Sequence, residues 1–169
     1  MSTRSTTHFH WTKTKDDPAE YGELAAIVYR HADGYPSGAG VDLQKFIART
    51  GNLPDSRHDD AAYLAARYVV FLAEMFAIDW RADPPRPKRD RLDFISCGIV
   101  REDPGDIDYR YHIQCGQPPI VTCERIDYDW KAGTSTGIKI DLAAEIAAEQ
   151  KAHRAARRRT LAHARKATP

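Results

Sequence analysis

The chain has 169 residues, of which 42% are hydrophobic and 29% are charged, and its formal net charge is +1. This length fits one globular domain, because domains commonly have about 100–200 residues, and it suffices for a core without disulfides. The chain has three cysteines, Cys97, Cys115 and Cys123. An odd number of cysteines argues against a secreted disulfide scaffold. No apolar leader is visible near the N-terminus, so we expect a cytoplasmic protein.

Residues 1–21 are polar, and the alternation His8-Phe9-His10-Trp11 within them is too short to predict a strand. We therefore expect 1–21 to be a separate polar segment that precedes the core. Residues 24–30 are rich in β-branched and aromatic side chains, which predicts a strand. A turn at 31–40 follows, because its glycines and proline favour a tight reversal of the backbone.

Two helices are predicted after this turn. The first covers 43–49, with Asp42 as its cap, and the second runs from Asp55 or Ser56 to about Asp79. The second helix is apolar on nearly every side but contains Arg67 and Glu74. A charge near the centre of a spanning helix costs roughly 2.5–3.5 kcal/mol, so we expect a buried core helix and not a membrane span.

Residues 81–91 contain several prolines and basic side chains, and this composition predicts a surface loop. Strands are expected next at 92–101, 107–115 and 120–128, separated by turn sequences. The alternation in 107–115 predicts one packed face and one wet face. The packed face holds Tyr109, Tyr111, Ile113 and Cys115, and the wet face holds Asp108, Arg110, His112 and Gln114.

The C-terminal region from 133 to 169 is predicted to begin with a flexible break at 133–137 and to continue as an Ala- and Arg-rich helix. The fold class expected from these elements is α+β. A small antiparallel sheet, made of an N-terminal strand and a three-stranded meander, would pack against two or three helices. The core domain would cover 22–132, with the basic loop at 81–91.

The segment His31-Ala32-Asp33-Gly34-Tyr35-Pro36 resembles a signature of small uncharacterised phage and prophage proteins. A second segment, Gly105-Asp106-Ile107-Asp108-Tyr109-Arg110-Tyr111, is similar to a strand motif of the same family. The two segments cover about residues 22–128, whereas the loop at 81–91 and the C-terminal helix have no counterpart in the family. The resemblance implies a product of a mobile element that acts in a bacterial cytoplasm, and it implies no activity.

Catalysis has one candidate pair in this sequence, His31 and Asp33, which would serve as an acid and a base. The other interpretation is structural: Asp33 closes an Asx-type turn over Gly34, and Tyr35 and Pro36 complete it. We expect the structural role for His31, Asp33, Gly34, Tyr35 and Pro36, because no serine or cysteine nucleophile stands beside them.

Metal binding has conceivable ligands in the three cysteines, in His112 and in the pair His8 and His10. Zinc sites usually contain closely spaced ligands such as Cys-x-x-Cys, and the chain has no such pair. We therefore predict no metal site and no cofactor.

The charges are distributed unevenly. Residues 151–169 carry seven of the 25 basic residues and no acid, which leaves 18 basic and 24 acidic side chains elsewhere. An acidic body with a basic tail suggests two surfaces for charged partners. The predicted basic surface is Arg86, Lys88, Arg89, Lys151, Arg154, Arg157, Arg158, Arg159, Arg165 and Lys166. The predicted acidic surface is Asp55, Asp59, Asp60, Asp103, Asp106, Asp108, Asp127 and Asp129.

These observations predict a non-enzymatic phage or mobile-element accessory protein. It would bind and inhibit a host protein or ribonucleoprotein complex, as an anti-CRISPR inhibitor does. The first alternative is a nucleic-acid-binding regulator that uses the basic C-terminal helix. The second alternative is a small enzyme that uses His31 and Asp33.

Overall fold

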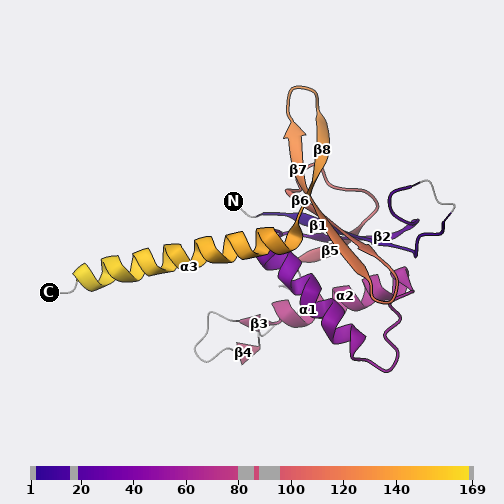
Figure 1. Cartoon of the computed structure of the whole chain (residues 1–169), viewed down its shortest axis with the longest axis horizontal. Coiled ribbons are helices and arrows are strands. Elements are labelled where there is room, and N and C mark those ends of the chain that lie inside the picture. Colours follow the sequence, from indigo (N-terminus) through magenta and orange to yellow (C-terminus); the bar gives the residue numbers. More distant parts are fainter. Residues whose placement is uncertain (1–2, 16–18, 80–85, 88–95, 168–169) are drawn as a thin grey trace.

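The computed structural model describes residues 3–15, 19–79, 86–87 and 96–167, and it shows an α+β fold (Figure 1). A six-stranded mixed sheet has the order β5-β2-β1-β6-β7-β8, and β3 and β4 form a separate two-stranded sheet. The strands are β1 (Ser5–His10), β2 (Leu24–Arg30), β3 (Ile78–Asp79), β4 (Arg86–Pro87), β5 (Cys97–Val100), β6 (Tyr109–Gln114), β7 (Ile120–Asp129) and β8 (Thr134–Ile140). The helices are η1 (Pro36–Gly40), α1 (Val41–Gly51), α2 (Ala61–Phe76) and α3 (Leu142–Ala167).

The sheet is larger than the sequence predicts, and the difference lies in β1 and β8. β1 occupies the middle of the sheet, antiparallel to β2 and parallel to β6. The polar segment expected to precede the core therefore supplies a central strand. Residues 134–137, expected to be part of a flexible break, instead begin β8, which pairs with β7 along its whole length. Local patterning misses β1 because its partner β6 lies about 100 residues away in the chain. It misses β8 because the small polar residues and glycine at 134–137 favour a break, although β8 forms a hairpin with the adjacent β7.

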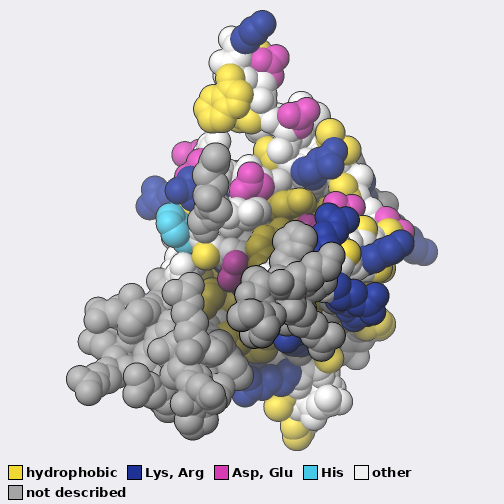
Figure 2. Space-filling view, turned by 90° about the vertical axis from the view of Figure 1, so that its left-hand side faces the viewer, with side chains coloured by type: hydrophobic (Ala, Val, Ile, Leu, Met, Phe, Trp, Pro, Cys, Tyr) yellow, Lys and Arg dark blue, Asp and Glu magenta, His cyan; other side chains and the backbone are white. Residues whose placement is uncertain are grey.

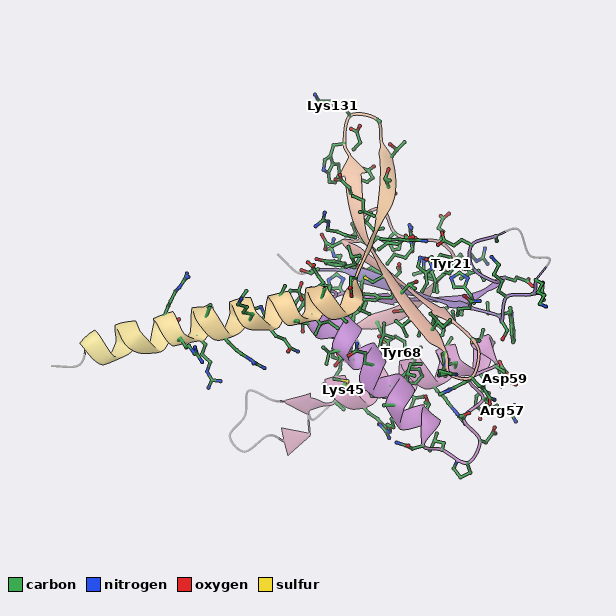
Figure 3. The ribbon with its side chains drawn as sticks, viewed as in Figure 1. Tyr21, Lys45, Arg57, Asp59, Tyr68 and Lys131 are labelled. Atoms are coloured by element: carbon green, nitrogen blue, oxygen red, sulfur yellow. The ribbon has the colours of Figure 1, made fainter. Side chains whose placement is uncertain are left out.

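The core lies between one face of the sheet and the helices α1 and α2. Phe9 of β1 and Tyr111 of β6 point toward this side and are fully buried. Tyr68 of α2 is at the centre: its ring lies 5.7 Å from that of Phe9 and 5.1 Å from that of Phe46 on α1 (Figure 3). Burial of side chains of this size stabilises a fold by roughly 1.5–3 kcal/mol each.

Helix α2 has the central place that its composition predicts, although it begins later than expected. Asp60 is its cap and accepts a hydrogen bond from the backbone nitrogen of Tyr63 at 2.9 Å. Leu64 and Leu72 of α2 are fully buried. Within the described ranges, no helix has both the length and the apolar character that crossing a membrane requires.

The turn before α1 connects the start of β1 to the core. The nitrogen of Gly34 donates to the carbonyl of Thr3, and the carbonyl of Gly34 accepts from the Tyr111 hydroxyl at 2.8 Å. A Cβ at position 34 would lie 2.6 Å from the carbonyl carbon of Arg4, so only glycine fits here. The glycine at this position is therefore explained by the close packing of the turn against β1 and β6.

Asp42, expected to cap α1, instead forms a buried ion pair. Its carboxylate accepts from Nη1 of Arg30 on β2 at 2.8 Å, and both side chains are more than nine-tenths buried. The pair joins the sheet to the first turn of α1. Loss of either partner would leave the other charge buried and without solvent, which would lower the free energy of unfolding.

We expect Asp42→Ala to lower the free energy of unfolding by about 3–5 kcal/mol, because the charge of Arg30 would remain buried without an anionic partner. Asp55→Ala is the matched control: it removes an exposed pair with Arg57 and costs less than about 1 kcal/mol. Urea unfolding followed by circular dichroism measures both. Equal effects of the two substitutions would contradict the role assigned to the buried pair.

Candidate functional site

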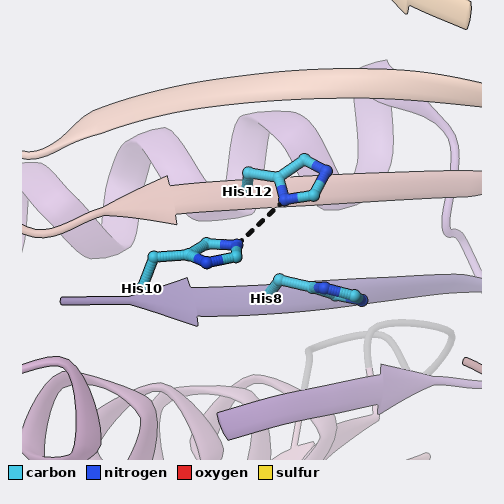
Figure 4. Close-up of side chains that lie close together, drawn as sticks. All are labelled: His8, His10 and His112. Atoms are coloured by element: carbon cyan, nitrogen blue, oxygen red, sulfur yellow. Dashed lines mark hydrogen bonds between the residues drawn. The ribbon is translucent and has the colours of Figure 1, made fainter. Parts of the chain in front are cut away.

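Three histidines meet on the face of the sheet that points away from α1 and α2. His8 and His10 alternate with the core residue Phe9 along β1, and His112 stands beside His8 in the parallel register of β1 with β6 (Figure 4). Although none of the described helices packs on this face of β1, the three residues are only 9%, 6% and 5% exposed. This histidine cluster (His8, His10 and His112) is therefore an interior site.

A segment between β1 and β2 covers the cluster. The ring of Tyr21 stacks on His112 with centroids 4.1 Å apart and planes inclined by 6°, and it also stacks on His10. The carbonyl of the next residue, Gly22, lies 3.0 Å from Nδ1 of His10. A Cβ at Gly22 would lie 2.0 Å from the carbonyl oxygen of Trp11, so glycine permits this close approach.

Asp103, in the connection from β5 to β6, holds the outer side of His8. Its carboxylate lies 2.7 Å from Nε2 of His8 and accepts from the Thr6 hydroxyl and from Nε of Arg110, each at 2.6 Å. Burial alone would raise the pKa of Asp103. The hydrogen bonds from His8 and Thr6, with the positive charges nearby, outweigh burial and hold that pKa well below its usual range.

Glu124 of β7 holds the outer side of His112. Its Oε2 accepts from Nη1 of Arg110 at 2.9 Å and lies 3.5 Å from Nε2 of His112. Gly137 of β8 makes room for this carboxylate, because a Cβ there would lie 2.3 Å from Oε2. The absence of a side chain at 137 thus lets Glu124 reach the cluster.

The hydrogen bonds of the cluster leave one nitrogen without a partner. Because a carbonyl only accepts, Nδ1 of His10 donates to Gly22, and Nε2 of the neutral ring carries a lone pair. Nδ1 of His112 then donates to that nitrogen across 3.0 Å, as the dashed line in Figure 4 marks. Nε2 of His112 is left with a lone pair that faces Glu124, and among the described residues it is buried without a hydrogen-bond partner.

At neutral pH, protonation of His112 does not supply the missing hydrogen bond from its Nε2 to Glu124. Burial lowers the pKa of His112 to about 4, helped by the charge of His8 and only partly opposed by Glu124. Burial also lowers the pKa of His10. A metal cation would give every ring nitrogen a partner. The nitrogens that face the centre of the cluster would bind the cation with their lone pairs, and the nitrogens on its outer side would carry hydrogens to donate.

The geometry of the cluster fits a metal ion. One nitrogen of each ring lies within 4.8 Å of a nitrogen from each of the other two. Ligand nitrogens in a tetrahedral zinc site are about 3.3 Å apart, given Zn–N bonds of about 2.0–2.1 Å. The outward nitrogens of His8, His10 and His112 would then donate to Asp103, the Gly22 carbonyl and Glu124. Such outer partners orient the histidine ligands of metal sites.

The prediction of no metal site stays a prediction, but the structure brings together three histidines whose nitrogens could hold an ion. His8 and His10 form a spaced pair on one strand face, which a search for Cys-x-x-Cys spacing does not find. The expected wet face of 107–115 is wrong at His112, which Tyr21 covers. The cysteines take no part: Cys115 and Cys123 lie in the helix-side core, where burial raises the pKa of Cys115 to about 11 and that of Cys123 to about 12.

His31 and Asp33 lie at the exposed turn between β2 and η1. The Tyr29 hydroxyl is 3.2 Å from Nδ1 of His31, and the Tyr35 hydroxyl donates to Asp33 at 3.3 Å. Asp33 has a φ of 55°, in the left-handed region that turns use, and Pro36 is buried at the start of η1. These are contacts between neighbours within a turn.

The predicted acidic residues are spread over the molecule. Asp59 lies near the start of α2, far from the tip of the β7–β8 hairpin at Lys131 (Figure 3). Asp55 and Asp60 are close to Asp59 in the chain, whereas Asp127 and Asp129 are exposed on β7.

Three other acidic residues of the predicted surface are engaged within the protein. Asp106 pairs with the Arg4 side chain, and Asp108 accepts from the Arg4 backbone nitrogen at 2.9 Å. Asp103 belongs to the histidine cluster and not to an open surface. The eight residues thus do not form one patch, although Asp106, Asp108 and Asp127 line the same hollow.

The predicted basic residues fall mostly on α3. Lys88 and Arg89 lie outside the described residues, and Arg86 is in β4. The basic residues that lie on α3 are Lys151, Arg154, Arg157, Arg158, Arg159, Arg165 and Lys166.

We expect the metal-free protein to lose stability as the pH falls from about 6.5 to about 4. As the pH falls below about 6.5, the ordinary pKa of histidine, unfolded His112 binds a proton that the buried ring accepts only near pH 4. This difference costs roughly 1–3 kcal/mol, and the lowered pKa of His10 acts in the same direction. Urea unfolding with a chelator present, at several pH values, measures the slope. His112→Gln should flatten it, whereas replacement of the exposed His153 by Gln should not. An unchanged slope in His112→Gln would refute the assignment.

No family model, no curated protein and no solved structure was found that matches the chain. The resemblance of the turn at 31–36 to phage proteins stays a prediction.

Proposed function

We propose that this protein binds one divalent transition-metal ion, zinc being the best fit, through His8, His10 and His112. The observation that carries the proposal is the buried Nε2 of His112, which has no hydrogen-bond partner in the described structure and faces the Glu124 carboxylate. A metal bound at Nδ1 of His112 would make Nε2 a donor to Glu124. One bound ion would thus give Nε2 of His112 the hydrogen-bond partner that it lacks in the metal-free cluster.

The chemistry of the ligands favours zinc and its neighbours over magnesium and calcium. Imidazole nitrogens suit Zn²⁺, Cu²⁺, Ni²⁺ and Co²⁺, whereas Mg²⁺ and Ca²⁺ prefer oxygen ligands. The cysteines lie elsewhere, so the site would offer three nitrogen ligands and no thiolate.

The burial of the cluster favours a stabilising role for the metal. Tyr21 stacks over the rings, so a substrate would reach the ion only if the segment at 19–23 moved. An ion here would join β1 to β6, and through Gly22 and Asp103 it would fix two connecting segments. The inhibitor of a host complex predicted from the sequence stays a prediction, and a metal-stabilised scaffold is compatible with it.

Titration of the metal-free protein with Zn²⁺ tests the proposal. We expect one ion per chain and a rise in unfolding free energy of about 2.7 kcal/mol when free zinc is 100 times its Kd. Co²⁺ should give the visible absorption of a tetrahedral site. His112→Gln should abolish binding, and His153→Gln should leave it unchanged. A folded wild-type protein that binds no zinc, or a His112→Gln protein that binds it equally well, would refute the proposal.

Gly137→Ala offers a sharper test, because it acts on Glu124 and leaves the ligands in place. A Cβ at 137 would displace the flexible end of Glu124, and loss of such an outer partner weakens metal binding by about 10–100-fold. Gly98→Ala on β5 is the matched control, because a Cβ there meets nothing within 4 Å. Its zinc affinity should stay within about twofold of wild type. Equal affinities in the two variants would mean that Glu124 does not support the site.

A further inference from the structure

The second half of α3 extends away from the body of the protein (Figure 1). Its first turns are anchored: Ile146 is buried, and Glu149 accepts from the backbone nitrogen of Ser37 at 2.6 Å. The last ring contact of the helix is between His153 and Tyr35, with centroids 6.3 Å apart. Side chains described from 151 to 160 are all exposed, although the helix continues to Ala167.

This extended part, residues 151–167, is a basic arm. It contains seven basic residues and no acid. Within the described structure, no ion pair involves any of the basic side chains between 151 and 160. Lys151, Arg154 and Arg158 are spaced by three and four residues, which places them on one side of the helix within an arc of about 60°. Figure 2 views the molecule from the side toward which α3 extends and shows several Lys and Arg side chains there.

Tertiary packing does little to stabilise this part of the helix. The described side chains from Arg154 to Thr160 are all exposed, so they form no packed face against the body. Like charges three and four residues apart weaken it further. An anionic partner would remove this repulsion. The charge pattern therefore favours a ligand that carries many negative charges along its length.

We propose that the basic arm binds duplex DNA by lying in the major groove and contacting its phosphates. An α-helix is about 10–12 Å wide with its side chains, and the major groove of B-form DNA is about 12 Å wide. The corresponding groove of duplex RNA is too narrow and deep to enter. Ala152, Ala155 and Ala156 lie between the cations and keep the helix slim. The remaining chain, with 18 basic and 24 acidic residues, would repel DNA and limit contact to the arm.

Fluorescence anisotropy with a labelled duplex of about 20 base pairs tests this proposal on the full chain, between about 50 and 200 mM salt. Arg154→Gln/Arg158→Gln should weaken binding at least tenfold and make the log–log salt slope shallower by about 1.8, because two phosphate contacts are lost. Arg49→Gln/Lys131→Gln removes the same charge from the body and should change affinity less than twofold. Far-UV circular dichroism verifies that both variants keep their helix.

Three results would overturn the proposal: no binding of the DNA at the lowest salt, equal losses in the two double variants, or binding of a matched RNA duplex as tight as that of DNA. Binding of polyglutamate without binding of DNA would point instead to an acidic protein partner. DNA affinity should not change when a chelator removes metal, so this test is independent of the histidine cluster.

Discussion

The parallel pairing of β1 with β6 is the constraint on which the rest of the structure depends. It places a polar N-terminal segment in the middle of the sheet and aligns His8 with His112, two residues that are 104 positions apart in the chain. The same pairing sets Phe9 beside Ile113 on the opposite face, where both enter the core. One register thus produces both the hydrophobic core and the histidine cluster.

The two faces of β1 are buried in different ways, and the difference gives the site its chemistry. Helices cover the apolar face, whereas Tyr21 and Asp103 from connecting segments cover the polar one. Buried imidazoles need partners, and carboxylates and a carbonyl on the outer side provide them. Glycines at 22 and 137 allow the backbone and Glu124 to come close enough. The ring nitrogens that face the centre of the cluster are the atoms that would bind the proposed metal ion.

The two proposals concern separate regions of the molecule. The histidine cluster is interior, so the proposed metal ion would stabilise the scaffold. The described side chains of the basic arm from 151 to 160 are exposed, so the proposed DNA contact would lie outside the body. A scaffold made rigid at β1 and β6 would hold the base of α3 through the turn at 34–40, since Gly34 binds Tyr111 and Gly40 packs on Leu142.

Local sequence pattern determined the elements whose signal lies within a few residues of each other: the core helix α2, the strands β6 and β7, and the tight turn with its glycines. It also determined the odd positions of β6 as the packed face, because alternation reports burial on one side. Only the tertiary structure decided the place of β1, the strand β8 and the meeting of His8, His10 and His112. The place of β1 and the histidine cluster depend on pairing across about 100 residues and on what Tyr21 and Glu124 cover, which the short alternation at His8–Trp11 does not reveal. β8 pairs with the adjacent β7, but its glycine and small polar residues favour a break when they are considered locally.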